Sequence, residues 1–214
     1  MGVGSRGKDV VLSTVSFIGA APSVRRFIEL SSQAIAVAVE PQFDPAVWTT
    51  YEMRCELPMS AQFALVTRSF RRGVDEDGFL RVHRLASAGH PEIGLLDRQG
   101  LNALLTQPGV GPDSLQLYET EGVIAGYCLT RIAWWRGHRI GEIVAVALEP
   151  GLVGQGLGRE LVLKGLTDLY RRGAGIGLLY VDANNLRAVR LYISLGFQVF
   201  RVDRRYGLAP PPVI

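Results

Sequence analysis

The stretch Val144–Glu160 reads VAVALEPGLVGQGLGRE and decides the fold class. An apolar run of strand length comes first, and Pro150 and Gly151 end it. A loop with glycines at alternate positions follows and leads directly into a helical pattern. This order places several backbone N–H groups at a helix N-terminus, where the first-turn donors lack intrahelical partners and the macrodipole favours negative charge. The stretch therefore predicts an anion site, which we interpret as a pyrophosphate site.

The composition describes a globular protein and sets limits on its function. The 214 residues suit one domain of ordinary size, and the 48% hydrophobic content is enough for a core. The formal net charge is +3 and the basic residues are scattered, so we expect no nucleic-acid partner. The apolar stretches are shorter than the ~20 residues that span a bilayer, so we expect no membrane segment. Cys55 and Cys128 fit neither a disulfide framework nor a metal site, so a cytoplasmic location and no bound metal are expected.

From residue 63 onward, strand and helix patterns alternate regularly. The polar turn Glu119–Gly122 is a hairpin signal, and Asp97 is placed to cap a helix. The order of strand, two helices, hairpin, strand, helix, strand, helix and strand predicts an α/β domain with a mixed central sheet flanked by helices. The expected strands are 64–68, 115–118, 123–133, 141–148, 176–181 and 197–202, and the expected helices are 75–88, one after Asp97, one after Gly156 and 184–195.

The two ends of the chain have less pattern. Residues 1–62 carry no motif, although residues 48–57 read as a strand, and we interpret them as an N-terminal extension. The folded domain is then expected at 63–208, followed by a proline-rich tail at 209–214 that cannot pair in a sheet.

The glycine turn by itself leaves other anion sites open. A dinucleotide-binding turn needs Gly-x-Gly-x-x-Gly, whereas this chain has Gly-x-Gly-x-Gly, although Asp182 stands where a ribose-binding acid is expected. A P-loop needs Gly-Lys followed by Ser or Thr, which the turn lacks. The late position of the turn, after a hairpin, argues against both.

A second segment, Leu178–Phe197, gives the turn a more specific meaning. It contains Asn-x-x-Ala-x-x-Leu-Tyr-x-x-x-Gly-Phe, and with Val146–Gly158 it resembles the GCN5-related N-acetyltransferase (GNAT) superfamily. The resemblance implies the GNAT fold, with acetyl-CoA as co-substrate. The turn would bind the pyrophosphate and the strand before it the pantetheine arm. The implied cofactor-binding residues are Val146, Ala147, Leu148, Val153, Gly154, Gln155, Gly156, Leu157, Gly158, Arg159, Asn185 and Ala188.

Further similarity is carried by the segments 73–82, 89–92, 141–143, 179–183 and 202–206. Over about Ala64 to Leu208 the chain thereby resembles the C-terminal catalytic domain of the mycothiol synthase family, which acetylates the cysteinyl amine of the mycothiol precursor. That family carries two tandem GNAT domains with a degenerate first one, so residues 1–62 are interpreted as the remnant of such a domain. Two departures stand out. Val153 replaces the usual Arg or Gln, with Gln155 and Arg159 as candidates to compensate. The strand 126–131 lacks the family's His-Trp-x-Lys element.

Acetyl transfer to an amine needs a base for the amine and an acid for the leaving thiolate. The resemblance implies Glu142 as base. An α-amine with a pKa near ~8 costs about 1.4 kcal/mol to deprotonate at pH 7, within reach of a carboxylate acting through water. It implies Tyr192 as acid, because a phenol with a pKa of about 10 can protonate a thiolate. Each residue also has a structural interpretation: Glu142 as a surface strand-end carboxylate, Tyr192 as a core tyrosine and Asn185 as a helix N-cap.

The leading hypothesis is an acetyl-CoA-dependent N-acetyltransferase that modifies a small-molecule or peptide amine by direct attack in a ternary complex. Mycothiol synthase itself and a non-catalytic CoA-binding or sensor domain are the alternatives. His83 and His90 are interpreted as structural or acceptor-side groups. His138 lies beside two tryptophans in an expected exposed loop, which we interpret as a simple loop, with the border of the acceptor site as the alternative.

Overall fold

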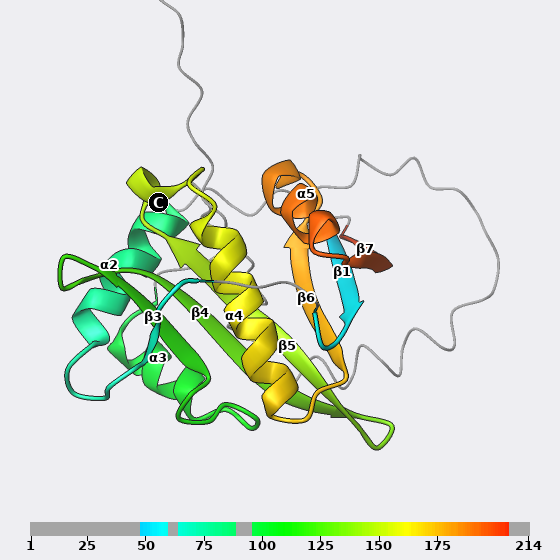
Figure 1. Cartoon of the computed structure of the whole chain (residues 1–214), viewed down its shortest axis with the longest axis horizontal. Coiled ribbons are helices and arrows are strands. Elements are labelled where there is room, and N and C mark those ends of the chain that lie inside the picture. The colour runs from blue at the N-terminus through cyan, green and yellow to red at the C-terminus, as the bar shows by residue number, and fades with distance from the viewer. Residues whose placement is uncertain (1–47, 60–63, 89–95, 206–214) are drawn as a thin grey trace, which may run out of the picture.

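The computed structural model describes residues 48–59, 64–88 and 96–205, and its strands lie in the order β2-β3-β4-β5-β6-β1-β7 (Figure 1). β5 and β6 are parallel, and every other neighbouring pair is antiparallel. The mixed sheet flanked by helices is therefore confirmed. The strands are β1 (Trp48–Glu56), β2 (Arg68–Ser69), β3 (Leu115–Thr120), β4 (Val123–Trp135), β5 (His138–Leu148), β6 (Ile176–Asp182) and β7 (Gln198–Arg205). The helices are α2 (Glu76–Ser87), α3 (Arg98–Leu105), the 3-10 turn η2 (Pro150–Leu152), α4 (Leu157–Arg171) and α5 (Leu186–Ser194).

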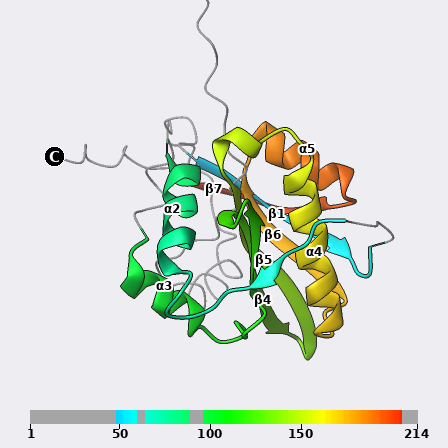
Figure 2. The ribbon, with the colours of Figure 1, turned by 60° about the vertical axis from the view of Figure 1, so that its left-hand side comes forward.

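The helices cover the sheet in pairs, with α2 and α3 on one face and α4 and α5 on the other (Figure 2). Two apolar clusters fill the layers between. Ile143 and Val146 of β5 belong to the cluster under α4 and α5, whereas Val144 and Ala147 belong to the cluster under α2 and α3. β5 is therefore buried on both faces, which explains why it reads as an unbroken apolar run.

Two-residue turns join β3 to β4 and β4 to β5. Glu121 and Gly122 have φ values of 53° and 76°, and Arg136 and Gly137 have 49° and 81°. Two successive left-handed residues are typical of the two-residue turns that join antiparallel strands. The predicted β3–β4 hairpin is confirmed. The loop expected around His138 is wrong, because this residue already pairs with β4 as the first residue of β5.

β1 lies inside the sheet, antiparallel to both β6 and β7. Its strand pattern is confirmed, and Met53 and Cys55 are buried in the same cluster as α4 and α5. The sheet therefore includes residues that precede the domain boundary expected at residue 63. The interpretation of residues 1–62 as a remnant stays a prediction. Residues 1–47, 60–63, 89–95 and 206–214 lie outside the described residues, and with them His90 and the proline-rich tail.

The strand expected at 64–68 is largely wrong. Regular pairing is confined to Arg68–Ser69, and residues 64–67 have no regular structure. The N–H groups of Ala64 and Leu65 donate instead to the carboxylate of Glu160 on α4, at 2.7 and 3.1 Å. A side-chain acceptor thus replaces the strand partner that this apolar run would otherwise need.

Candidate active site

The parallel strands β5 and β6 separate at the centre of the sheet. They pair only where Ile140–Glu142 face Ile176–Leu178, yet β5 continues to Leu148 (Figure 1). The separation coincides with a register shift against β4 that leaves Val144 as an extra residue, and such bulges bend a strand. Beyond Glu142, the edge of β5 that faces β6 has no strand pairing in the described sheet. This edge presents backbone donors and acceptors to a ligand.

β5 leads through η2 into the glycine turn at the N-terminus of α4. Gly154 and Gly156 have φ values of 97° and 85°, which L side chains rarely adopt, and Gly156 is the N-cap of α4. The N–H groups of Leu157 and Gly158 lie in the first turn, one turn too early for an intrahelical acceptor. The backbone therefore has the arrangement expected of an anion site. Which anion it holds stays a prediction.

The side chains around this turn are arranged differently from expectation. Val153 packs against the core. Gln155 Nε2 donates to the carbonyl of Gly151 at 3.2 Å, and Arg159 Nη1 donates to Ser194 Oγ at 3.0 Å. Of the two residues expected to compensate for Val153, Gln155 is thus bonded within its own loop and Arg159 to α5.

Asn185 is the N-cap of α5. Its Oδ1 accepts a hydrogen bond from the N–H of Ala188 at 3.1 Å, and both residues are buried. Their burial at the start of α5 explains why the motif needs a capping amide followed by a small residue. The structural interpretation of Asn185 is confirmed, and its contact with a cofactor stays a prediction.

Glu142 is a buried carboxylate, with 3% of its surface exposed. Its Oε2 accepts a hydrogen bond from Arg131 Nε at 3.0 Å and a second one from Arg131 Nη2. Because side chains alternate along a strand, Glu142 points to the α2 and α3 face, opposite Ile143. The interpretation of Glu142 as a surface carboxylate is therefore wrong, and its role as base stays a prediction.

Tyr192 lies on the other face of the sheet. It is fully buried in the cluster with Cys128 and Val146, and its ring meets Phe197 edge-on at 5.7 Å between centroids. Burial raises the pKa of the Tyr192 phenol well above its usual value, and the neighbouring Cys128 adds to the rise. The hydroxyl is therefore protonated at neutral pH. This environment fits a core tyrosine, and the role of Tyr192 as acid stays a prediction.

Sequence reasoning missed a second buried carboxylate near Glu142. Glu52 of β1 is 3% exposed and is paired with Arg54 and with Arg201 of β7. Tyr180 of β6 faces Glu52 in the sheet register. Burial raises the pKa of Tyr180 to about 12, and the charges of Glu52 and Glu142 add to the rise. The sequence signal was the alternation of polar residues in the strand pattern at 48–57, which has a meaning only once the neighbouring strands are known.

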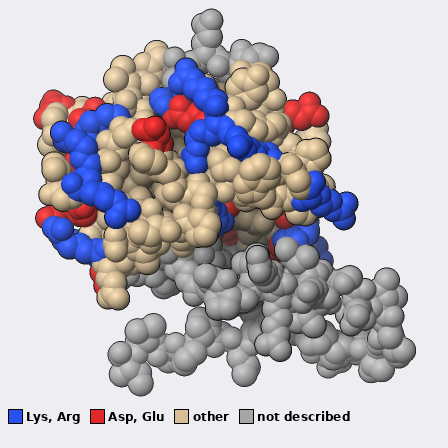
Figure 3. Space-filling model, turned by 90° about the horizontal axis from the view of Figure 1, so that it is seen from below, with Lys and Arg blue, Asp and Glu red and all other residues tan. Residues whose placement is uncertain are grey.

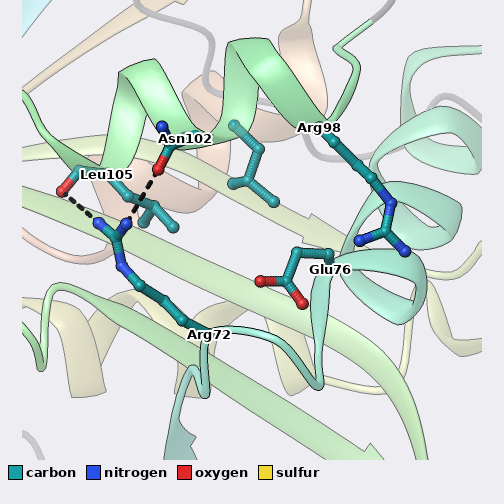
Figure 4. Close-up of a pocket in the computed structure, with 6 residues that line it drawn as sticks. Arg72, Glu76, Arg98, Asn102 and Leu105 are labelled. Carbon is teal, nitrogen blue, oxygen red and sulfur yellow. Dashed lines mark hydrogen bonds between the residues drawn. The ribbon is translucent and has the colours of Figure 1, made fainter.

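A separate cavity of about 230 Å³ lies between the start of α2 and α3 (Figure 4). Arg72 reaches across it and donates to Asn102 Oδ1 at 2.9 Å and to the carbonyl of Leu105 at 3.3 Å. None of the predicted site residues lines it. Its lining residues are Arg72, Glu76, Arg98, Leu101, Asn102 and Leu105.

Charged groups are dispersed on the face seen from below in Figure 3. Lys and Arg side chains form several separate groups there, with Asp and Glu among them. Within the described ranges, no helix is long and apolar enough to cross a membrane. The same residues contain no group of three or more His, Cys, Asp or Glu side chains arranged to hold a metal ion.

Comparison with known proteins agrees with this architecture. The profile of the acetyltransferase (GNAT) family matches residues 83–197. The mycothiol acetyltransferase of Thermomonospora curvata is 41% identical over 144 residues, which are 67% of this chain and 48% of that protein. The mycothiol acetyltransferase of Thermobifida fusca is 39% identical over 150 residues, 67% of this chain and 46% of that protein. The chain thus spans about half the length of these curated relatives.

Solved structures show the same fold at low sequence identity. A GCN5-related N-acetyltransferase from Sphaerobacter thermophilus superposes with a TM-score of 0.60 at 21% identity, covering 88% of this chain and 57% of that one. A GNAT-family acetyltransferase from Colwellia psychrerythraea gives 0.55 at 12% identity, covering 92% and 64%. These matches show the fold, and the family profile, which covers more than half of the chain, shows that the chain belongs to the acetyltransferase (GNAT) family.

Proposed function

We propose that the protein is an acetyl-CoA-dependent N-acetyltransferase that modifies a primary amine by direct attack in a ternary complex. The observation that carries the proposal is the open edge of β5, which leads directly into the glycine turn at the N-terminus of α4. An extended pantetheine arm suits an unpaired strand edge, and a pyrophosphate suits a helix N-terminus. The side chains of Val146, Ala147 and Leu148 are buried in the two apolar clusters, so these residues would contact the arm through their backbone.

A thioester bound along the unpaired edge of β5 would lie between the two faces of the sheet. Glu142 lies on the α2 and α3 face, and Tyr192 lies in the cluster on the α4 and α5 face. We assign Glu142 to accept the amine proton through a water molecule, and Tyr192 to donate a proton to the departing thiolate. The new N–C bond forms as the C–S bond breaks, and a backbone N–H near Val146 polarises the carbonyl. Arg131 acts as a positioning residue, because its guanidinium holds the Glu142 carboxylate in place.

Acetylation of the cysteinyl amine of the mycothiol precursor is a second candidate. The observation in its favour is the 41% identity to a protein named mycothiol acetyltransferase. An α-amine also matches the modest base that the site provides. The strand 126–131 argues against it, because it lacks the His-Trp-x-Lys element.

A panel of amines with thiol release as the readout tests the proposal, beside thermal unfolding with acetyl-CoA. Acetyl-CoA at 100 times its Kd is expected to stabilise the fold by about 2.7 kcal/mol. Thiol release is expected to be faster with α-amines than with a lysine ε-amine, because less free energy is needed to deprotonate them. Stabilisation without turnover of any amine would favour the non-catalytic CoA-binding alternative. The absence of stabilisation at millimolar acetyl-CoA would contradict the proposal.

A further inference from the structure

The glycine turn has no cation of its own. Its residues 153–158 are Val, Gly, Gln, Gly, Leu and Gly. The first basic residue of α4, Arg159, is bonded to Ser194 on α5. Backbone N–H groups alone bind a doubly charged pyrophosphate less strongly than a site that also contains a guanidinium. Arg159 is thus held towards α5 through one of its nitrogens, and a second guanidinium near the turn comes from another element.

Arg187 of α5 brings a guanidinium to the turn. A Cβ atom at Gly154 would lie 3.3 Å from Arg187 Nη2, the one heavy atom within 4 Å of that position outside the adjacent residues. Gly154 therefore leaves room for the guanidinium as well as adopting a positive φ. Arg187 is exposed in the first turn of α5, two residues after the capping Asn185. No acidic side chain pairs with it in the part of the chain that the structure describes.

We propose that Arg187 is a phosphate-binding residue that completes the turn as a pyrophosphate site for CoA. A guanidinium is planar and presents its N–H donors as a fork that matches two phosphate oxygens. This inference rests on the proposed function, since CoA is the ligand that supplies the pyrophosphate. It assigns to α5 the charge that Val153 does not provide.

The acidic groups nearest to the turn in sequence have other partners. Glu160, in the first turn of α4, accepts from the backbone of Ala64 and Leu65. Glu149, at the end of β5, is paired with Arg81. Neither carboxylate competes for Arg187, so its guanidinium can meet an incoming anion.

Calorimetric titration with CoA tests the assignment in four proteins: wild type, Arg187→Ala, Arg187→Lys and Arg190→Ala. Arg190 is the matched control, because it is exposed on the same helix and its removal changes the net charge equally. Arg187→Ala is expected to weaken the Kd about 10- to 100-fold, the range of a charge-assisted hydrogen bond. The Kd of Arg187→Lys is expected to lie between those of wild type and Arg187→Ala, since lysine keeps the charge and loses the forked pair of donors. Arg190→Ala is expected to stay close to wild type.

A second titration uses dephospho-CoA, which has the pyrophosphate but lacks the 3′-phosphate. The ratio of the Arg187→Ala Kd to the wild-type Kd is expected to be the same for CoA and for dephospho-CoA. If Arg187→Ala and wild type had nearly the same Kd for dephospho-CoA, Arg187 would contact the 3′-phosphate, and the pyrophosphate assignment would be overturned. An Arg187→Ala Kd close to the wild-type value, or an equal loss in Arg190→Ala, would overturn the role of Arg187. Failure of the wild type itself to bind millimolar CoA would instead overturn the proposed function, and this inference with it.

Discussion

Glu142→Gln separates the catalytic role of the buried carboxylate from its structural role. The side chain is 3% exposed and that of its partner Arg131 is 32% exposed. Breaking a fully buried pair costs about 3–5 kcal/mol, and breaking an exposed one less than about 1 kcal/mol. The glutamine keeps an oxygen that can accept from Arg131, and the guanidinium remains partly in water. We therefore expect the free energy of unfolding to fall by about 1–2 kcal/mol, measured by urea denaturation.

The catalytic effect of the same change is expected to be much larger. Loss of a general base lowers turnover typically about 10²- to 10⁴-fold, and the Kd for acetyl-CoA should stay unchanged because Glu142 points away from the α4 cluster. Turnover is measured by thiol release at saturating acetyl-CoA, at a temperature where both proteins are folded.

Asp75→Asn provides a matched control for this substitution. Asp75 is also 3% exposed and paired with an arginine, Arg68 at 2.6 Å, but it stands at the N-cap position of α2, where its carboxylate accepts from the N–H of Arg71 and not from the helix. This variant should lose stability and keep its turnover. Turnover of Glu142→Gln within threefold of wild type, or an equal loss in Asp75→Asn, would refute Glu142 as base.

Three further predictions concern Tyr192, Asn185 and His83. Tyr192→Phe keeps the ring in the core, so it should lower kcat at least about tenfold with an unchanged Kd for acetyl-CoA; an unchanged kcat would exclude the acid role. Asn185→Ala removes the cap of α5 and should lower the free energy of unfolding by about 1 kcal/mol, whereas Asn185→Asp should not; equal urea midpoints for the two variants would contradict the capping role. Burial lowers the pKa of His83 below its ordinary 6.5, so the unfolded chain binds the proton first as pH falls; the free energy of unfolding should therefore decline below about pH 6.5, and His83→Gln should reduce that decline. A pH dependence that this variant leaves unchanged would assign the decline to other groups.

Local signals predicted most of the fold. Asp97 caps α3 as expected, accepting from the N–H of Gly100 at 2.7 Å, and Glu121-Gly122 forms the tight turn between β3 and β4. The place of β1 did not follow from the sequence. Its partner strands β6 and β7 are more than 100 residues away, and such pairing leaves no trace in a local pattern.

The residues of the candidate site also divide into those that a local motif predicts and those that depend on tertiary packing. Asn185 and Tyr192 follow from one continuous motif on one helix. The pairing of Glu142 with Arg131 depends on the β4–β5 register, which a bulge shifts by one residue. The approach of Arg187 to Gly154 depends on how α5 is placed beside the glycine turn. Contacts of this kind are set by tertiary packing, so they become visible only in three dimensions.

The central claim is that CoA binds along the open edge of β5 and on the glycine turn. Titration of the ¹⁵N-labelled protein with CoA, followed by amide chemical shifts, measures this directly. We expect the largest shifts at Gly154, Gly156 and Gly158 and along residues 146–148, and small shifts at the cavity lined by Arg72. If the amides of the turn stay unchanged while signals elsewhere move, CoA binds at another place and the account is contradicted.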